Sequence, residues 1–143
     1  MSESSRNCKS TVIPGFRYRN APAAIEWLCG VFGFEKHAVY ANPDGTIAHA
    51  ELTFEGGMIM LGSVKRSEYD QLMKQPDEIG KANTHSVNLI TSDPDAVYAR
   101  AKAAGAEIVF DIEDKGYGGR AFTCRDPEGY IWGVGSYDPW QSK

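Results

Sequence analysis

The sequence predicts an α+β fold in which two tandem β-α-β-β-β modules form a curved mixed sheet around a cup, with the helices on the outer face. An internal repeat, two capped helices and strands of alternating polarity support this prediction. The repeat has a spacing of 72 residues, as in Pro22 and Pro94 (94 − 22 = 72). Two copies are too few for a solenoid, which needs about three stacked units, so we expect one closed pseudo-symmetric domain. The other matched pairs are Gly33 with Gly105, Glu35 with Glu107, Gly57 with Gly129, and Ile59 with Ile131.

The first module begins with a predicted strand over residues 12–19 and a helix that follows it. Asn20 is the expected N-cap, and Pro22 lies in the first turn, where a proline is well tolerated. Apolar residues then recur at helical spacing until Gly33, which ends the helix. A second strand is predicted over 35–40.

Two further strands, over 47–54 and 58–63, complete the first module. In the strand 47–54 the even positions are apolar, whereas His49, Glu51 and Thr53 are polar. Such alternation is typical of a strand covered on one face, and the helix should cover the even face. The odd face then either lines the cup, a mixed surface suited to ligand binding, or faces water.

The second module repeats this order, with a strand over 84–90, a helix over 94–104 capped by Ser92 or Asp93, and a stop at Gly105. Its remaining strands are predicted over 107–111, 120–125 and 130–137. The organisation is one structural domain overall, made of a disordered or frayed tail over 1–11, a first module over 12–63, a linker over 64–83 with a short helix near 67–74, a second module over 84–137 and a tail over 138–143.

Composition narrows the function classes. The chain has 143 residues, 42% hydrophobic and 24% charged, which is typical of a soluble globular domain. No apolar run is long enough to span a membrane, and the N-terminal residues lack a secretory signal, so we expect a cytoplasmic protein. A net charge of −4 argues against nucleic-acid binding, which depends on Lys and Arg neutralising phosphates. The three cysteines show no paired spacing, and we expect free thiols.

Two segments carry a resemblance to a known family. The first is Arg19-Asn20-Ala21-Pro22-Ala23-Ala24-Ile25-Glu26-Trp27-Leu28 leading to Phe32-Gly33-Phe34, and the second is Asp126-Pro127-Glu128-Gly129-Tyr130 before the last strand. With the paired modules, these segments resemble the vicinal oxygen chelate superfamily, which includes glyoxalase I, extradiol dioxygenases, fosfomycin-resistance enzymes and bleomycin-resistance proteins. The resemblance covers about residues 12–137. It implies that two modules, commonly from two chains, close each cup, so we expect a homodimer.

In metal-dependent members, the resemblance implies four ligands, one from the first and one from the last strand of each module. The corresponding positions here are Ile13, Leu61, His85 and Gly133, and the 72-residue register pairs 13 with 85 and 61 with 133. Only His85 has a side chain that can donate to a metal. We therefore expect no cofactor, because a divalent ion needs several converging donors.

A displaced divalent-metal site is the alternative to a metal-free protein. His49 and Glu51 share one strand face, and with His85 they would form a set of two histidines and one carboxylate if the strands lay side by side. Otherwise His49 and Glu51 are wall residues of a pocket or simple surface residues.

Three more segments are candidates for ligand contact. Arg17 shares the parity of Ile13, near a position where glyoxalase-like members use arginine for an anionic group, or it is paired with a nearby acid. Tyr117 and Arg120 frame a glycine-rich stretch that either forms a mobile lid or serves a hairpin. Thr123 lies on the odd face of the strand 120–125. The expected apolar walls are Ile13, Leu61, Val87 and Leu89.

The leading functional hypothesis is a metal-free protein of the bleomycin-resistance type that binds a small molecule in the cup. The alternative is a glyoxalase-like lyase, isomerase or dioxygenase that uses a displaced metal or His85 as an acid-base group. A third possibility is a regulatory or interaction module with no ligand. Whether the chain is an enzyme stays open, with binding favoured.

Overall fold

The computed structural model describes residues 9–141 and divides the chain into two compact units after Gln75. The division falls inside the predicted linker, 64–83. Each unit holds one β-α-β-β-β module, which confirms the predicted α+β class with tandem modules, and each module has its own four-stranded mixed sheet. None of the helices within residues 9–141 is long and apolar enough to cross a membrane.

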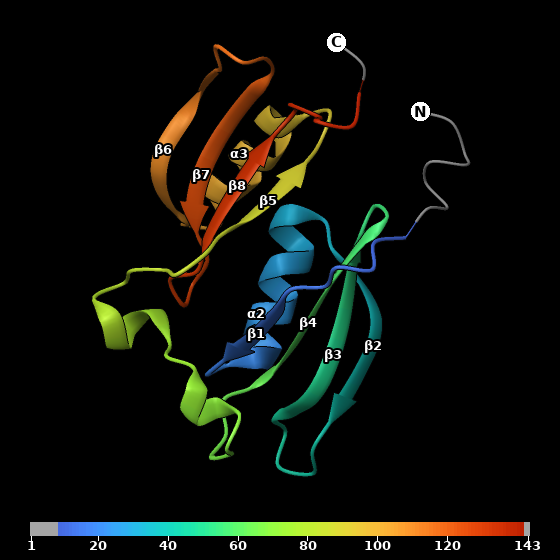
Figure 1. Cartoon of the computed structure of the whole chain (residues 1–143), viewed down its shortest axis with the longest axis vertical. Helices are drawn as coiled ribbons and strands as arrows, with labels where there is room; N and C mark the ends of the chain where they lie inside the picture. Colours follow the sequence, from blue (N-terminus) through green and yellow to red (C-terminus); the bar gives the residue numbers. More distant parts are fainter. Residues whose placement is uncertain (1–8, 142–143) are drawn as a thin grey trace. The chain divides into compact units, whose positions relative to one another are not determined.

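The first unit is a four-stranded sheet with one helical segment (Figure 1). Its strand order is β1-β4-β3-β2, with β1 parallel to β4 and the other neighbours antiparallel. A parallel β1–β4 pair requires a crossover, which the helix and the β2–β3 hairpin supply. The elements are β1 (Gly15–Tyr18), α2 (Ala21–Trp27), η1 (Leu28–Phe32), β2 (Glu35–Ala41), β3 (Ile47–Phe54) and β4 (Gly57–Ser63).

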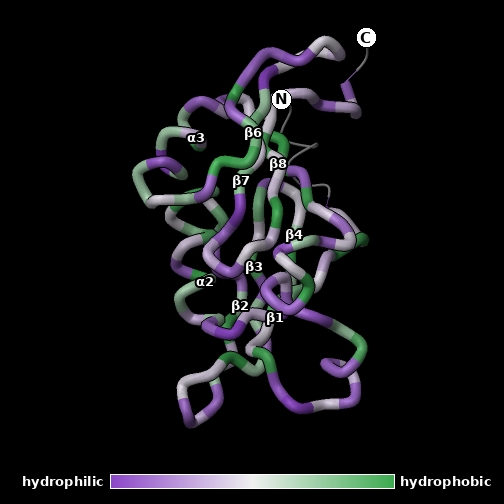
Figure 2. The backbone as a smooth tube through the Cα atoms, turned by 90° about the vertical axis from the view of Figure 1, so that its left-hand side faces the viewer, coloured by the Kyte–Doolittle hydropathy of each residue, from purple (hydrophilic) through white to green (hydrophobic). Residues whose placement is uncertain are grey.

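Helix α2 begins where the sequence predicted. The Asn20 side chain accepts a hydrogen bond from the Ala23 amide at 3.2 Å, and Pro22 lies in the first turn. The helix continues into the π-helical turn η1 and ends at Gly33, whose φ of +91° is left-handed. Both hydrophobic and hydrophilic residues occur along the helices (Figure 2). The buried residues of α2, Ala21, Ala24 and Ile25, are spaced so that they share one side of the helix.

The core of the first unit lies between this helix and one face of the sheet. Phe16, Tyr18, Leu52 and Leu61 are buried there, and Ala50 on β3 is fully buried. Because side chains alternate along a strand, the residues between these face the other way. The even face of β3 is therefore the helix-covered one at Ala50 and Leu52, as predicted.

The second unit has the same topology, with strand order β5-β8-β7-β6 and β5 parallel to β8 (Figure 1). Asp93 is the N-cap of its helix and accepts a hydrogen bond from the Ala96 amide at 3.1 Å. Its core contains the fully buried Trp132 with Phe122, Cys124 and Val134. The elements are β5 (Val87–Ile90), α3 (Pro94–Ala103), β6 (Glu107–Asp114), β7 (Arg120–Arg125) and β8 (Ile131–Gly135).

Strand β5 begins three residues later than the predicted start at Thr84. The Asn83 side chain explains this, because its Oδ1 accepts the Ile131 amide and its Nδ2 donates to the Gly129 carbonyl, each at 3.1 Å. A side chain thus takes the place of backbone pairing at this end of β8. Backbone pairing starts at Val87 with Trp132.

The segment after β4 contains two 3-10 turns, η2 (Asp70–Leu72) and η3 (Pro76–Ile79), in place of a helix over 67–74. Asp70 accounts for the difference because its carboxylate bonds the Lys65 amide at 2.8 Å and the Ser67 hydroxyl at 3.1 Å. Local side-chain bonds of this kind compete with an α-helix.

The spacing between equivalent residues of the two modules is not 72 throughout. The N-caps Asn20 and Asp93 are 73 residues apart (93 − 20 = 73), whereas Gly33 and Gly105 are 72 apart (105 − 33 = 72). The extra residue of the first module lies between its helix start and Gly33, where the π-helical turn accommodates it. The second module has its own extra residue in the β7–β8 turn, so β4 and β8 are again offset by 73.

Of the predicted tails, residues 1–8 and 142–143 lie outside the described residues, whereas 9–11 and 138–141 are described. Within the described part, the Ser10 amide donates to the Gly56 carbonyl at 2.8 Å. Residue 10 is therefore hydrogen-bonded, while residues 9–12 are exposed and belong to no helix or strand, and the prediction of a frayed tail over 1–11 stays a prediction.

Candidate functional site

Each sheet has one face that its own helix does not cover. We call the uncovered face of the first sheet the first open face. Register places Met60 beside Gly15 and Glu51, and Met58 beside Thr53. The face consists of Gly15 and Arg17 from β1, Met58, Met60 and Gly62 from β4, His49, Glu51 and Thr53 from β3, and Glu35, Ala38 and Tyr40 from β2, with the His37 side chain reaching towards Glu51.

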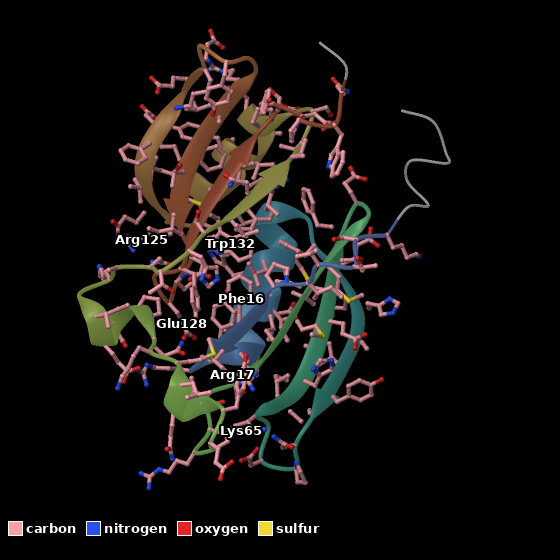
Figure 3. All side chains as sticks on the ribbon, viewed as in Figure 1. Phe16, Arg17, Lys65, Arg125, Glu128 and Trp132 are labelled. Carbon is pink, nitrogen blue, oxygen red and sulfur yellow. The ribbon has the colours of Figure 1, made fainter. Side chains whose placement is uncertain are left out.

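Arg17 lies at the β1 edge of this face and is fixed on several sides. Its Nε donates to Asp70 Oδ1 at 2.9 Å, and its guanidinium carbon lies 5.1 Å from the Tyr69 ring centroid. Figure 3 shows Arg17 and Lys65 beside the segment that follows β4. The structure therefore shows the second sequence interpretation, an arginine paired with a nearby acid.

Gly62 gives the Arg17 guanidinium its space. A Cβ at position 62 would lie 3.4 Å from Arg17 Nη1 and 3.1 Å from the Ala48 carbonyl oxygen. The approach to the carbonyl oxygen is the tight one, and the backbone at Ala48 would have to give by a few tenths of an ångström. The distance to Arg17 is close to an ordinary van der Waals contact, so the glycine leaves room for the guanidinium beside β4.

Asp70 is the acid that orients Arg17, and only 8% of its side chain is exposed. Burial raises the pKa of its carboxyl, but hydrogen bonds from the Lys65 amide, Arg17 and Ser67 outweigh burial and hold that pKa below its usual range. The Gln75 side chain adds a 2.7 Å bond to the Arg17 carbonyl. The segment 65–75 is therefore tied to β1 through both the side chain and the backbone of Arg17.

Glu51 lies at the middle of the first open face between two histidines. His49 Nε2 is 2.9 Å from Glu51 Oε2, and His37 Nε2 from β2 is 3.9 Å from Glu51 Oε1. The Tyr40 ring stacks on His49, with 6.2 Å between centroids. His49 and Glu51 thus come together on the open face as the sequence predicted, and His37 joins them.

Sequence reasoning missed Met58, Met60, His37 and Tyr40. For Met60 a signal existed in the sequence. Phe54 and Gly57 pair at the β3–β4 hairpin, so three residues farther along each strand Glu51 pairs with Met60. The signal was hidden by the assumption of a uniform 72-residue register.

The prediction that Leu61 lines the cup is wrong. Leu61 is 1% exposed and pairs with Phe16 and Ala50, both of which are buried. It therefore lies on the helix-covered face, not on the open face where a family ligand or a ligand-binding wall would have to be. Leu89 is likewise buried in the core of the second unit, and Val87 shares its side of β5.

The offset between equivalent strands of the two modules explains why Leu61 was placed on the open face. Met60 and Gly133 occupy equivalent positions, opposite Glu51 and Thr123 respectively, and are 73 residues apart (133 − 60 = 73). The offset of 73 also pairs Ile13 with Ser86 and not with His85. Ile13 is half-buried before β1, and His85 is exposed before β5.

The open face of the second sheet carries Thr123 and Gly133 at its centre, where they pair with each other. Asn88 from β5 lies over Gly133, where a Cβ would meet its Oδ1. Phe110, opposite Thr123 on β6, is 64% exposed. Thr123 is thus on the open face, as predicted.

Tyr117 and Arg120 do not form a lid over this face. Gly119 has a φ of +73°, and a Cβ there would lie 2.6 Å from the Tyr137 amide nitrogen, so the glycines serve the β6–β7 hairpin. Arg120 pairs with Asp95 of helix α3 at 3.0 Å. Tyr117 contacts the Tyr137 ring edge-on at 5.2 Å.

Comparison with known proteins identifies the family. The model of the Glyoxalase/Bleomycin resistance protein/Dioxygenase superfamily matches residues 13–134. The chain belongs to this superfamily. A Mycobacterium tuberculosis protein described as uncharacterised is 28% identical to this superfamily member over 129 residues, covering 90% of this chain and 75% of the relative.

Solved structures agree with this assignment. TioX from Micromonospora sp. ML1 is 30% identical with a TM-score of 0.66, covering 88% of this chain and 97% of TioX. The fosfomycin resistance protein FosX from Listeria monocytogenes has a TM-score of 0.62 at 10% identity, covering 90% of this chain and 92% of FosX. At that identity, the similarity to FosX supports only the fold.

The metal centre of the metal-dependent superfamily members does not fit these residues. Leu61 is in the core and Met60, the residue of β4 that faces the open side, offers only a weakly coordinating thioether. Gly133 has no side chain and Ile13 has no lone pair, which leaves His85 as the one nitrogen or oxygen donor of the set. Among residues 9–141, no three His, Cys, Asp or Glu side chains are grouped so that they could hold a metal ion. The convergence of His85 with His49 and Glu51 stays a prediction.

Proposed function

We propose that this superfamily member binds a small molecule on the open faces of its sheets without a metal. The first open face carries the proposal, because it combines polar groups with apolar, half-buried thioethers at Met58 and Met60. Ligand sites are typically apolar surfaces with a few well-placed polar groups. Methionine is suited to them because its side chain adapts to different shapes.

The polar groups of this face are held in place before any ligand arrives. Arg17 is held by Asp70, and Glu51 by His49. Preorganised groups lose little conformational freedom on binding, which favours affinity. Binding of this kind needs shape and hydrogen bonds, and it needs no reacting group.

The enzymatic alternative depends on His85. Its imidazole is exposed, with Nδ1 at 3.5 Å from the Thr84 hydroxyl. A general base works best when another group orients it. The hydrogen-bond partner of His85 Nδ1 is a hydroxyl and not a carboxylate, which favours binding over acid-base catalysis by this residue. We also propose a homodimer, because members of this superfamily are often dimers; a monomer in sedimentation at micromolar concentration would contradict it.

Thermal-shift screening of antibiotics and metabolites tests the binding proposal. With protein dialysed against EDTA, we expect at least one compound to raise the melting temperature with a dependence on its concentration. The effect should be lost in Met60→Ala, on the open face, and kept in the control Met73→Ala, on the segment after β4. No stabilisation by any compound would instead favour a module without a ligand.

A further inference from the structure

The first open face carries more negative than positive charge. This excess points to a ligand class for the proposed binding function, on which the inference rests. The face carries one arginine, and Arg17 is already paired with Asp70 at 2.9 Å. Glu51 and, at the β2 end, Glu35 add two carboxylates. At a pH where histidine is neutral, the face therefore has a negative charge centred on Glu51.

The Glu51 carboxylate has room for another donor. It accepts one hydrogen bond from His49 at 2.9 Å, while His37 lies beyond hydrogen-bond distance at 3.9 Å. An ionised carboxylate offers about four lone-pair positions. With 27% of its side chain exposed, Glu51 remains accessible to a bound group.

The neighbours of Glu51 indicate the rest of the ligand. Its cross-strand partners are Met60 on β4 and the small Ala38 on β2, so the carboxylate has a thioether on one side and, on the other, a methyl group with the His37 imidazole 3.9 Å away. The stacked rings of Tyr40 and His49 provide an aromatic surface next to it. Aromatic faces and polarisable sulfur both favour an aromatic body, and aromatic faces also favour a cation.

We propose that the first open face takes an organic cation with an apolar or aromatic body, whose positive group pairs with Glu51. The charged and titratable groups of the face around Glu51 are His49 on its own strand, Glu35, His37 and Tyr40 on β2, and Arg17 on β1, which is paired with Asp70. Strand β4 contributes only uncharged residues, Met58, Met60 and Gly62. The one lysine of β2, Lys36, pairs across the sheet with the buried Leu52 and forms an ion pair with Glu26 of helix α2, so it lies on the other face. An ammonium or guanidinium group can therefore approach Glu51 from β2, β3 and β4 without meeting a fixed positive charge.

Methionine-methyl NMR at pH 8 tests the charge preference with three probes of one shape: 1-naphthylmethylammonium, 1-naphthalenemethanol and 1-naphthoate. The chain has four methionines, and Met58 and Met60 report on the open face while Met73 is an internal reference. We expect the cation to shift the Met58 and Met60 signals at concentrations about tenfold lower than the other probes. Glu51→Gln should remove this advantage.

The control is Glu26→Gln, which removes the same charge from helix α2, where Glu26 pairs with Lys36. It should leave the preference for the cation unchanged. Equal shifts by all three probes would overturn the charge inference while supporting small-molecule binding at this face. If no probe shifts the Met58 or Met60 signals, both the binding proposal and the charge inference are overturned. If Glu26→Gln removes the preference for the cation as fully as Glu51→Gln does, the preference is a general charge effect and the assignment to Glu51 is overturned.

Discussion

Arg17 and Asp70 form an ion pair at the edge of the first open face, and this pair joins β1 to the segment after β4. Sequence parity placed Arg17 on the correct face, because alternation along a strand needs only local information. Its partner could not be predicted, because Asp70 lies 53 residues away in an irregular segment. Pairings set by a loop path leave no periodic signal in a sequence.

Asp70 makes the free energy of unfolding depend on pH. A lowered native pKa means that the unfolded state takes up protons first, so the stabilisation is present above about pH 4 and is lost as the pH falls through the native pKa. We expect Asp70→Asn to be less stable than wild type in urea at pH 7, with the difference shrinking towards pH 2.5. The control Glu68→Gln, at an exposed site, should show no such trend. A difference independent of pH would contradict this role.

At the scale of elements, the sequence predicted which strands and helices exist better than it predicted their register. Strands 47–54 and 120–125 were predicted with their observed bounds, since both alternate strictly. The π-helical turn and the longer β7–β8 turn each add one residue without a strong sequence signal. One residue reverses the face of every side chain in a strand, which is why Leu61 was placed on the open face in error and Met60 was missed.

The β7–β8 turn owes its shape to the buried Asp126. Its Oδ2 accepts the Trp132 indole at 3.1 Å, and its Oδ1 accepts the Glu128 and Tyr130 amides at 3.0 and 3.1 Å. Figure 3 shows Arg125, Glu128 and Trp132 grouped around this turn. The family-like segment Asp126-Pro127-Glu128-Gly129-Tyr130 therefore has a structural role here.

We expect Asp126→Ala to lower the free energy of unfolding by about 3 kcal/mol, because it leaves buried donors without an acceptor. Urea denaturation measures the loss. The matched control is Asp44→Ala, because Asp44 is an exposed turn aspartate that accepts a hydrogen bond from the Thr46 amide. Its loss should be clearly smaller, and equal losses would show that burial of Asp126 has no special effect.

At the scale of the whole molecule, the sequence predicted two modules of one topology, and the structure confirms them. It also predicted that Arg17, His49, Glu51 and Thr123 face away from the helices. The family-derived positions were less successful: Leu61 is buried in the core, and His85 precedes its strand. Alternation is a local property, whereas equivalence between modules depends on every insertion along the chain.

The central claim is that a small molecule binds on these open faces without a metal. The most direct test is calorimetric titration of the most stabilising compound from the thermal-shift screen. One sample is dialysed against EDTA, and the other is then supplied with Ni, Zn, Mn or Fe. We predict the same dissociation constant in both samples. Binding that disappears after EDTA and returns with one of these metals would contradict the claim.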